Sequence, residues 1–165
     1  KNIIMLTCDA FGVLPAVSKL TAKEASEHFM LGYTAKIPGT EIGIQEPETV
    51  FSPCFGAPFM PLAPKVYGEL LAKKIAENDV HCWLVNTGWA GGSYGKGKRM
   101  RISLTRDIIH GINSGTLAKE KTIKHPILGL EVPESIEMPE ELWTNKAEYE
   151  ATAKKLLEIF KENKS

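Results

Sequence analysis

Five cationic side chains follow a glycine-rich segment within a short stretch of the chain. Five of the ten residues from 88 to 97 are glycine, and the cations, which fall within eleven residues, are Lys96, Lys98, Arg99, Arg101 and Arg106. Phosphate recognition uses such cations together with backbone N–H groups that approach the anion closely, as glycine permits. The pattern indicates either part of a phosphate site or a solvated basic loop.

Thr105 adds a hydroxyl to this region. The apolar spacing predicts a helix from Thr105 to Asn113, so Thr105 is expected near a helix N-terminus, where free amides can meet an anion. The sequence has no GxxxxGK[ST] phosphate loop, no GxSxG nucleophile elbow and no histidine or carboxylate pair with metal-ligand spacing. Spacing therefore predicts part of an anion site without a complete catalytic apparatus.

Two apolar segments are expected to position this region. Residues 3–7 and 81–85 form apolar runs, which are typical of strands buried on both faces of a sheet. They end at residues 8–9 and 86–87, and each then enters a loop that contains glycine. Because ligands of open α/β sheets bind beyond the carboxyl ends of strands, these two ends are the expected place for a site.

Helical patterns alternate with these strands. A capping box formed by Thr21 and Glu24 predicts a helix over residues 22–31, and Pro64 is a good first residue for a helix to about residue 77. The remaining patterns predict short strands at 101–103 and on both sides of Pro126, a short strand with turns over 51–64, and a last amphipathic helix from Asn145. The expected class is α/β, with a mixed, largely parallel sheet and helices on both faces.

The segment from Tyr33 to Glu48 is predicted to be a long loop. It contains two prolines and two glycines and few large apolar residues. Long loops in compact domains are often lids or binding loops, and we expect a lid here.

Composition limits the classes of protein that remain. The chain has 165 residues, 43% of them hydrophobic, which suits one domain with a real core. Twenty basic residues balance twenty acidic ones, which argues against a general nucleic-acid binder. No apolar run approaches the roughly 20 residues of a membrane helix. We therefore expect no nucleic-acid partner and no membrane association.

Several residue types allow both a structural and a chemical interpretation. The three cysteines are widely spaced and odd in number, which favours a reducing cytosol, with Cys8 and Cys82 as small buried residues. Asp9, at a strand end, could help a metal or cap a turn, and the turn cap is favoured. Trp83 is expected in the core, and Trp89 is expected to anchor a loop, with a base pocket as its alternative. The four histidines are treated as structural or surface residues.

The first residues of the sequence are informative about whether it is a whole protein or a piece of one. The chain opens at Lys1 without an initiator methionine and enters an apolar run by residue 3. A chain that begins directly in a core strand is expected to be a piece of a longer protein.

Several long motifs, in order, cover nearly the whole sequence and resemble those of ATP-dependent phosphoenolpyruvate carboxykinases. The first is IMLTCDAFGVLPAVSKL, at residues 4–20, and the others lie at 28–36, 39–41, 51–56, 84–89 and 105–106. The resemblance is to the C-terminal part of that family only. It implies that residues 1–165 are the C-terminal part of an α/β mononucleotide-binding domain, with the N-terminal domain and the phosphate loop absent.

The resemblance also implies an activity and its cofactors. The family is a carboxy-lyase of gluconeogenesis that converts oxaloacetate and ATP to phosphoenolpyruvate, ADP and carbon dioxide in the cytoplasm. It uses Mg²⁺ with ATP and a second metal, typically Mn²⁺, whose ligands are expected upstream of this chain. The missing N-terminal part of the same enzyme is the expected partner, and the isolated 165-residue piece is expected to be inactive.

Roles in the family carry over to matched positions. Arg99 and Met100 resemble a nucleotide-contacting pair after the glycine loop, and Thr105 resembles a nucleotide-binding threonine. Lys19 occupies a basic position that contacts the transferred phosphate or a substrate carboxylate, although some members have arginine there. The lid residues implied by the resemblance, within about 33–48, are Gly39, Thr40, Glu41 and Gly43. Family members often have arginine where this chain has Ile42, which puts one lid contact in doubt.

The alternative belongs to another class of protein: a stand-alone nucleotide- or anion-binding or interaction domain without catalysis. The coding sequence upstream of Lys1 separates the two hypotheses. A GxxxxGK[ST] segment there favours the enzyme, and a start codon adjacent to Lys1 favours the binding domain.

Overall fold

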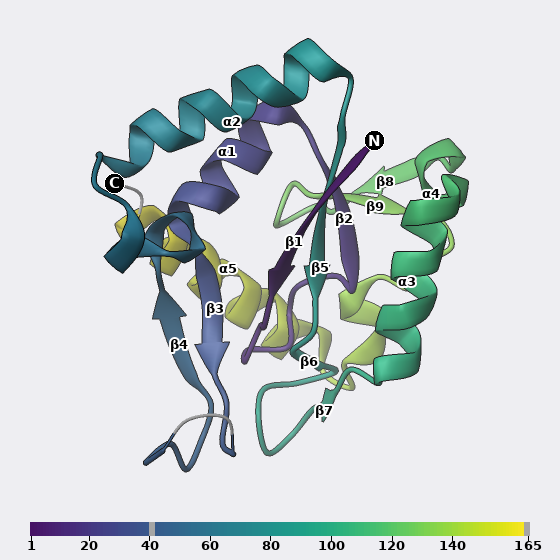
Figure 1. The fold of residues 1–165 in the computed structure, drawn as a ribbon. Coiled ribbons are helices and arrows are strands. Elements are labelled where there is room, and N and C mark those ends of the chain that lie inside the picture. Colours follow the sequence, from purple (N-terminus) through teal and green to yellow (C-terminus); the bar gives the residue numbers. More distant parts are fainter. Residues whose placement is uncertain (40–41, 164–165) are drawn as a thin grey trace.

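A five-stranded sheet forms the centre of the fold. The computed structural model describes residues 1–39 and 42–163. The strands of this sheet lie in the order β1-β5-β2-β9-β8 (Figure 1), and their bounds are β1 Asn2–Thr7, β2 Val17–Leu20, β5 His81–Asn86, β8 Thr122–Lys124 and β9 Glu131–Pro133. The two apolar runs are therefore confirmed as strands, β1 and β5, and they are neighbours. Strand β5 is buried as expected, whereas β1 forms an edge of the sheet and its Leu6 is 56% exposed.

The sheet is mixed. Strands β1 and β5 pair in parallel, from Asn2 opposite His81 to Thr7 opposite Asn86. The other three neighbouring pairs, β5 with β2, β2 with β9 and β9 with β8, are antiparallel. The expected α/β class with a mixed sheet is confirmed, and among the described strands of this sheet parallel pairing is confined to β1 and β5. Because these two strands run in the same direction, their carboxyl ends meet at one edge of the fold.

Helices cover both faces of the sheet, as expected (Figure 1). One face packs against α1 (Ala22–Leu31), α2 (Pro64–Asn78) and α5 (Lys146–Glu162), and the other packs against α3 (Ile102–Ser114) and α4 (Thr116–Lys119). Residues of β5 alternate between the two cores: Cys82 and Leu84 face α1, whereas Trp83 and Val85 face α3. All four are buried, which explains the continuous apolar run.

Local signals predict the helix ends well. Helix α1 spans residues 22–31 as predicted, and Thr21 and Glu24 form the expected capping box. Gly32 ends this helix at φ 56°, and a Cβ there would lie 1.7 Å from the Ser52 carbonyl oxygen. The last helix, α5, has Asn145 as its N-cap, and its predicted apolar stripe is buried at Tyr149, Ala153, Leu156 and Phe160.

Three sequence predictions were wrong in their bounds. The helix expected from Thr105 to Asn113 spans Ile102–Ser114 (α3). Residues 101–103 do not form a strand, because Lys98–Arg99 is the strand (β7), paired with Trp89–Ala90 (β6), and α3 already begins at Ile102. The expected loop from residue 33 to 48 begins and ends in strands, β3 (Tyr33–Lys36) and β4 (Glu48–Phe51), which pair as an antiparallel hairpin.

Strand β2 was not predicted from the sequence. It lies between Pro15 and the start of α1 and has only four residues. It nevertheless occupies the middle of the sheet, with Val17 and Leu20 buried. The described residues also form short 3₁₀ helices, η1 Pro53–Phe55, η2 Ala57–Phe59 and η3 Pro139–Leu142. Over the described ranges, no helix is both long and apolar enough to cross a bilayer.

A buried histidine ties the C-terminal helix to the rest of the fold. The Nδ1 atom of His125 accepts hydrogen bonds from the backbone N–H groups of Ile127 at 3.2 Å and Leu128 at 3.0 Å. Nδ1 therefore carries no proton, and the neutral ring holds its proton on Nε2, which lies 2.7 Å from the Tyr149 hydroxyl and 3.1 Å from Glu140 Oε2. The Tyr149 hydroxyl in turn donates to the Val13 carbonyl at 3.1 Å.

This network predicts a stability that depends on pH. Burial lowers the pKa of His125 below its ordinary value, although Glu140 acts in the opposite direction. A lowered folded-state pKa favours the neutral ring, so the stabilisation is complete above about pH 6.5 and is lost as the pH falls through the folded-state pKa. We expect His125→Gln to lower the unfolding temperature by about 4–10 °C at pH 7.5 and by less at pH 5.5.

Thermal unfolding followed by circular dichroism at the two pH values checks this expectation. His110→Gln is the control, because His110 is an exposed residue of α3 and should leave the unfolding temperature nearly unchanged. An equal difference between wild type and His125→Gln at both pH values would contradict a lowered folded-state pKa of His125.

Candidate functional site

Asp9 organises the loop that follows β1. Its side chain is fully buried and accepts four hydrogen bonds. These come from the backbone N–H groups of Phe11, Val13 and Leu14 at 2.7–2.8 Å and from the Tyr33 hydroxyl at 2.7 Å. Burial raises the pKa of Asp9, and the donors oppose this shift by stabilising the carboxylate. The expected role as a turn cap is confirmed.

Asn86 joins this loop to the one that follows β5. Its buried side-chain oxygen accepts from the backbone N–H groups of Asp9 at 3.0 Å and Gly88 at 2.8 Å. Its side-chain nitrogen donates to the Leu14 carbonyl at 3.2 Å. One side chain therefore holds both strand-end loops in a fixed relation, and this confirms that the two loops meet.

Glycines allow the two loops to touch. A Cβ at Gly88 would lie 2.3 Å from the backbone N and O of Asp9, which is too close for any side chain. A Cβ at Gly12 or at Gly97 would lie 2.0 Å from the Gly92 carbonyl oxygen. The glycine-rich segment is therefore packed against the first loop by backbone contact, and its glycines have a structural reason.

Arg99 and Met100 fold back over the end of β5. The Arg99 Nε atom donates to the Thr87 carbonyl at 3.3 Å, and the Met100 N–H donates to the Gly88 carbonyl at 2.8 Å. The Arg99 guanidinium carbon lies 5.8 Å from the centre of the Trp89 ring, within the range of a cation–π contact. Arg99 is exposed, so its remaining N–H donors face solvent at the strand-end loops.

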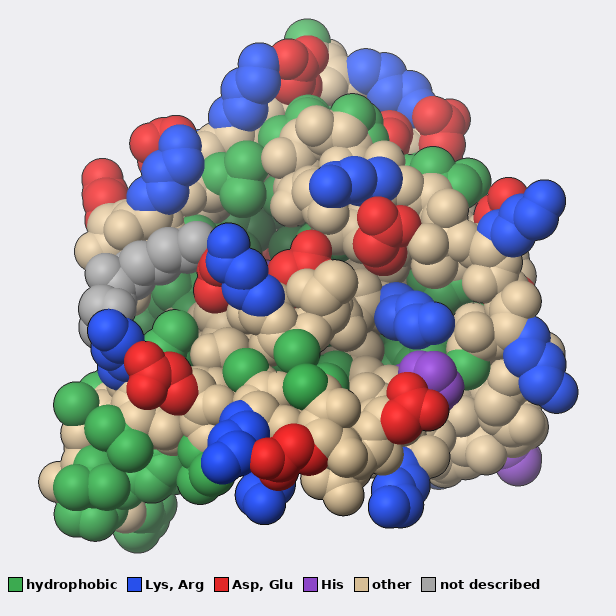
Figure 2. All heavy atoms as spheres, turned by 90° about the horizontal axis from the view of Figure 1, so that it is seen from above, with side chains coloured by type: hydrophobic (Ala, Val, Ile, Leu, Met, Phe, Trp, Pro, Cys, Tyr) green, Lys and Arg blue, Asp and Glu red, His purple; other side chains and the backbone are tan. Residues whose placement is uncertain are grey.

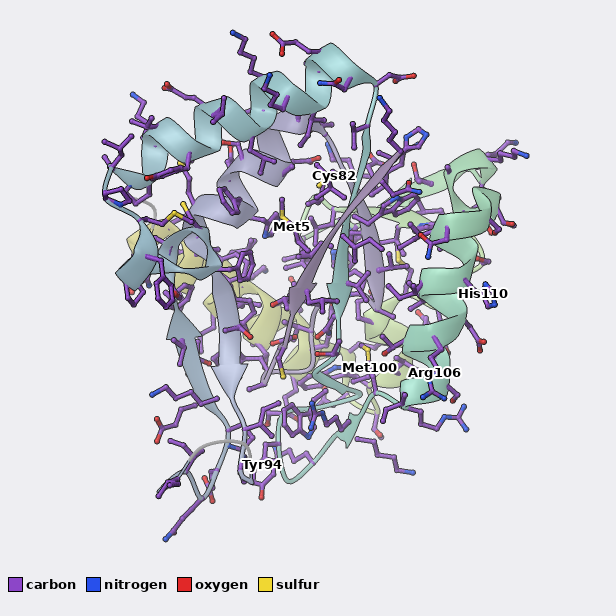
Figure 3. The ribbon with its side chains drawn as sticks, viewed as in Figure 1. Met5, Cys82, Tyr94, Met100, Arg106 and His110 are labelled. Carbon is purple, nitrogen blue, oxygen red and sulfur yellow. The ribbon has the colours of Figure 1, made fainter. Side chains whose placement is uncertain are left out.

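Thr105 lies in the first turns of α3, directly beyond this pair. The N-cap residue, Arg101, provides no side-chain cap, so the first N–H groups of the helix are available to a ligand. A groove of about 450 Å³ runs along the helix there and is lined by Ile102, Thr105, Arg106, Ile109, His110 and Asn113. Figure 3 labels Met100, Arg106 and His110 on this side of the fold. The groove combines apolar walls with a cation, which suits a flat ring that carries phosphate.

Lys19 lies apart from these residues. It is on β2, opposite Trp83 of β5, and its Nζ atom is 6.0 Å from the centre of the Trp83 ring. Val17, two residues earlier, is opposite Val85 and is nearer the strand-end loops. The structure thus groups Arg99, Met100 and Thr105 at the end of β5 and the start of α3, and it places Lys19 within the sheet.

The predicted lid corresponds to the tip of the β3–β4 hairpin. Gly39 and Gly43 are there, both with positive φ, and no described atom lies within 4 Å of the position that a Cβ would take at either residue. Thr40 and Glu41, the other two lid residues, lie outside the described residues. Tyr33, at the base of the hairpin, donates to Asp9. In Figure 1 the hairpin tip and the β6–β7 loop extend at the same end of the fold.

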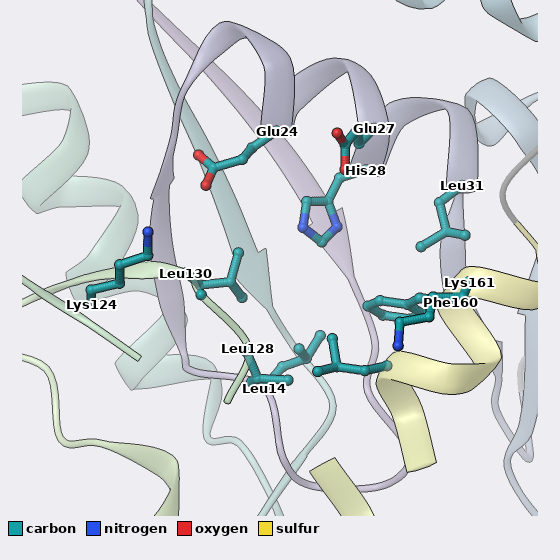
Figure 4. A pocket seen from close by; sticks show the side chains of 12 residues that line it. Leu14, Glu24, Glu27, His28, Leu31, Lys124, Leu128, Leu130, Phe160 and Lys161 are labelled. Atoms are coloured by element: carbon teal, nitrogen blue, oxygen red, sulfur yellow. The ribbon is translucent and has the colours of Figure 1, made fainter. Parts of the chain in front are cut away.

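A second hollow lies away from these loops. It has a volume of about 350 Å³ and lies between α1, α5 and the β8–β9 hairpin (Figure 4). Leucines and Phe160 form its apolar walls, and its polar lining residues are Glu24, Glu27, His28, Lys124 and Lys161. It includes none of the residues predicted to bind a nucleotide, although Leu14 from the Asp9 loop lines it.

No metal-ligand set forms in the parts of the chain that are described: no three histidine, cysteine or acidic side chains gather closely enough to hold an ion. Cys8, Cys54 and Cys82 are free and buried. Burial raises the pKa of Cys82 to about 11, so its thiol stays protonated at neutral pH. The residues present therefore do not fit a metal site of their own, and no step is assigned to a metal held by them.

Asn86, His125 and Tyr149 are organising residues that sequence reasoning missed. In the sequence, Asn86 is only the polar end of an apolar strand. Its contacts reach residues 72 and 77 positions earlier in the chain, and those of Tyr149 reach Val13, 136 positions away. The signal available in the sequence for Asn86 was a polar residue at the end of an apolar run, two positions before a glycine.

Comparison with known proteins gives one consistent result. A family model described as phosphoenolpyruvate carboxykinase matches residues 1–141. A phosphoenolpyruvate carboxykinase (ATP) of Geotalea uraniireducens (strain Rf4) is 52% identical over 169 residues, which cover 98% of this chain and 32% of the relative. The same-named protein of Ruegeria sp. (strain TM1040) is 51% identical over 170 residues, covering 99% of this chain and again 32% of the relative.

The similarity runs through the strand-end loops, the glycine-rich segment and α3. The chain spans about a third of the length of the curated relatives it matches, and the matched part is their C-terminal part. Because the family model covers most of the chain, including both strand-end loops and α3, the chain belongs to the ATP-dependent phosphoenolpyruvate carboxykinase family.

Proposed function

We propose that this chain is the nucleotide-contacting C-terminal part of a phosphoenolpyruvate carboxykinase. The whole enzyme would convert oxaloacetate and ATP to phosphoenolpyruvate, ADP and carbon dioxide, as the names of its relatives indicate. In this proposal Arg99, Met100 and Thr105 contact the nucleotide, and the β3–β4 hairpin tip closes over the substrates. The setting is gluconeogenesis in the cytoplasm.

One observation carries this proposal: the hydrogen bonds from Arg99 Nε to the Thr87 carbonyl and from the Met100 N–H to the Gly88 carbonyl. They fix the pair at the carboxyl end of β5, where ligands of α/β sheets bind. The same chain segment then enters α3, whose first turn has free N–H groups beside Thr105. Cation, hydroxyl and amides thus follow one another along a single backbone path.

These groups suit the demands of phosphoryl transfer, which depends mainly on positioning and on neutralising charge. The free face of the Arg99 guanidinium can donate to a nucleotide while its Nε bond and Trp89 hold it in place. The Thr105 hydroxyl and the adjacent groove, with Ile102 and Ile109 as apolar walls, can orient the rest of the nucleotide. The chain's own residues therefore bind and orient rather than react.

Lys19 and the hairpin tip have less direct support. Lys19 is proposed to neutralise charge on the transferred phosphate or a substrate carboxylate because of its matched position. Its observed neighbour is Trp83, so a role at the phosphate requires its flexible stem to extend toward the strand-end loops. For the hairpin, the support is the Tyr33–Asp9 bond, which connects its base to the loop after β1. A closed hairpin would exclude water that could protonate an enolate.

The proposal includes Mg²⁺ bound with ATP and a second metal ion, Mn²⁺, both held by the part of the enzyme that precedes this chain in its relatives. These ions would neutralise phosphate charge and polarise the oxygen atoms of the substrate. The described residues provide no ligand cluster for them. The N-terminal part of the same enzyme is accordingly the proposed partner.

Arg99→Ala is expected to weaken nucleotide binding. The test protein is a whole-length fusion of the Geotalea uraniireducens enzyme, up to the matched segment, with this chain. Loss of a charge-assisted hydrogen bond costs about 1.5–3 kcal/mol, so the KM for ATP should rise about tenfold or more. Lys98→Ala is the matched control, because Lys98 is the exposed neighbour on β7 and its side chain points to the opposite face.

Steady-state kinetics with varied ATP and saturating oxaloacetate give the KM for ATP of both variants. The control should change the KM for ATP by less than about twofold, since an exposed single charge contributes little. Equal KM values for wild type and Arg99→Ala would remove Arg99 from the nucleotide site.

The 165-residue chain alone is expected to show no turnover. Its sequence has no GxxxxGK[ST] segment to hold the phosphates, and its described residues have no metal-ligand cluster. The measurement is phosphoenolpyruvate formation from oxaloacetate and ATP with Mn²⁺, with the whole-length fusion as the positive control. Sustained product formation by the chain alone would show that the catalytic groups lie within it.

A further inference from the structure

The outer edge of β1 is open over most of its length, and at its end the Thr7 hydroxyl donates to the Tyr33 carbonyl of β3 at 2.7 Å. Strand β1 has one neighbour in the described sheet, β5, and forms its edge. The carbonyls of Lys1 and Thr7 accept hydrogen bonds from His81 and Thr87, at the two ends of β5. Because successive residues of a strand direct their backbone groups to opposite sides, the N–H and C=O groups of Ile4 and Leu6 point away from β5.

Apolar side chains accompany this open edge on both faces of the sheet. On the α3 face, Leu6 is 56% exposed, although its partner Val85 is fully buried. On the α1 and α2 face, a groove of about 470 Å³ lies along the strand. Its lining is entirely apolar and comprises Ile3, Ile4, Met5, Leu6, Phe29, Phe55 and Leu71.

The apolar surface continues beyond the groove over the η1–η2 segment and the start of α2. Exposed fractions there are 85% for Phe59, 57% for Leu62, 47% for Val66 and 52% for Leu70. Hydrophobic side chains gather at the lower left of Figure 2, the side on which Figure 1 places η1 and η2. A contiguous apolar surface of this kind beside unpaired backbone marks a place where another segment packs.

We propose that the edge of β1 and this apolar surface together are the docking surface for the part of the enzyme that precedes the matched segment in the relatives. A segment from that part would add a strand to β1, pairing with the backbone groups of Ile4 and Leu6, and would cover Leu6 and the groove. The length of the relatives indicates this occupant. The portion matched here is 32% of their length, so the rest of each relative is about twice as long as the matched portion. This proposal rests on membership of the family and not on the nucleotide contacts.

The opposite edge of the sheet provides a contrast. Strand β8 also has one neighbour in the described sheet, β9. It has only three residues, two of them polar, and Thr122 donates to Glu131 of the neighbouring strand. Ile123 is exposed to 47%, similar to Leu6, but the apolar groove lies along β1 and includes no residue of β8. Short, polar edges resist pairing, so β1 and not β8 is the edge built for extension.

Hydrogen–deuterium exchange tests the proposal without reference to nucleotide. Exchange is compared between the isolated chain and the whole-length fusion with the upstream part of the Geotalea uraniireducens enzyme. We expect the Ile4 and Leu6 amides to exchange at least about tenfold more slowly in the fusion, and the β8 amides to exchange at similar rates in both. The β5 amides, paired on both sides here, serve as the check that this part is folded.

Substitutions at the two edges provide a second measurement. Leu6→Asp should change the unfolding temperature of the isolated chain little, because the side chain is already half exposed, and should lower that of the fusion clearly. Ile123→Asp should have the same small effect in both proteins.

Each contrary outcome overturns the proposal. The first is that the β1 amides exchange equally fast in both proteins. The second is that Leu6→Asp and Ile123→Asp have equal effects on the unfolding temperature of the fusion. The third is that the isolated chain sediments as a dimer in which the β1 amides are already protected from exchange. The last result would assign the surface to a second copy. Failure of the fusion to bind ATP would count against the proposed function. It would leave the proposed docking of the upstream part at β1 unaffected.

Discussion

A single buried carboxylate, that of Asp9, is the interaction on which the arrangement of the strand-end loops depends. It accepts three backbone N–H groups and one tyrosine hydroxyl, so the loop after β1 turns around it. A buried carboxylate is costly unless its lone pairs are occupied, and here four donors occupy them. Because one of these donors is Tyr33, the same carboxylate also fixes the base of the β3–β4 hairpin. The turn after β1 and the proposed lid are therefore parts of one hydrogen-bonded unit.

The C-terminal third of the chain supports this unit from outside. Trp143 donates through its ring N–H to the Gly12 carbonyl, and Tyr149 donates to the Val13 carbonyl. The buried His125 positions the Tyr149 hydroxyl, and Lys96 of the glycine-rich segment forms an ion pair with Glu148 at the start of α5. The exposed ion pair contributes little by itself, whereas the buried hydrogen bonds leave unpaired groups if broken. Stability of the loops thus depends on α5, although α5 provides no predicted site residue.

The sequence was most informative where the signal is local. The capping box of α1, the proline at the start of α2 and the apolar stripe of α5 each predicted an element because the interacting residues lie within a few positions. Strand β2 and the roles of Asn86 and His125 depend on partners far along the chain, which spacing cannot show. The nucleotide-contacting roles predicted for Arg99, Met100 and Thr105 came from resemblance, whereas physical spacing alone indicated only a basic, glycine-rich segment followed by Thr105 near a helix N-terminus. The grouping of these three at the end of β5 is a property of the folded chain.

The two edges of the sheet show why the fold is best understood as part of a larger one. Natural sheets avoid leaving apolar strand edges exposed, because such edges pair with other chains. Strand β8 obeys this rule, being short and polar, whereas β1 has six residues and exposes Leu6 next to an apolar groove. Asp9 follows two residues after the end of β1, so whatever covers this edge also borders the loop that supports the proposed nucleotide site. A strand added at β1 would thus bring its own carboxyl-end or amino-end loop beside Asp9, which gives upstream residues a direct route to the proposed site.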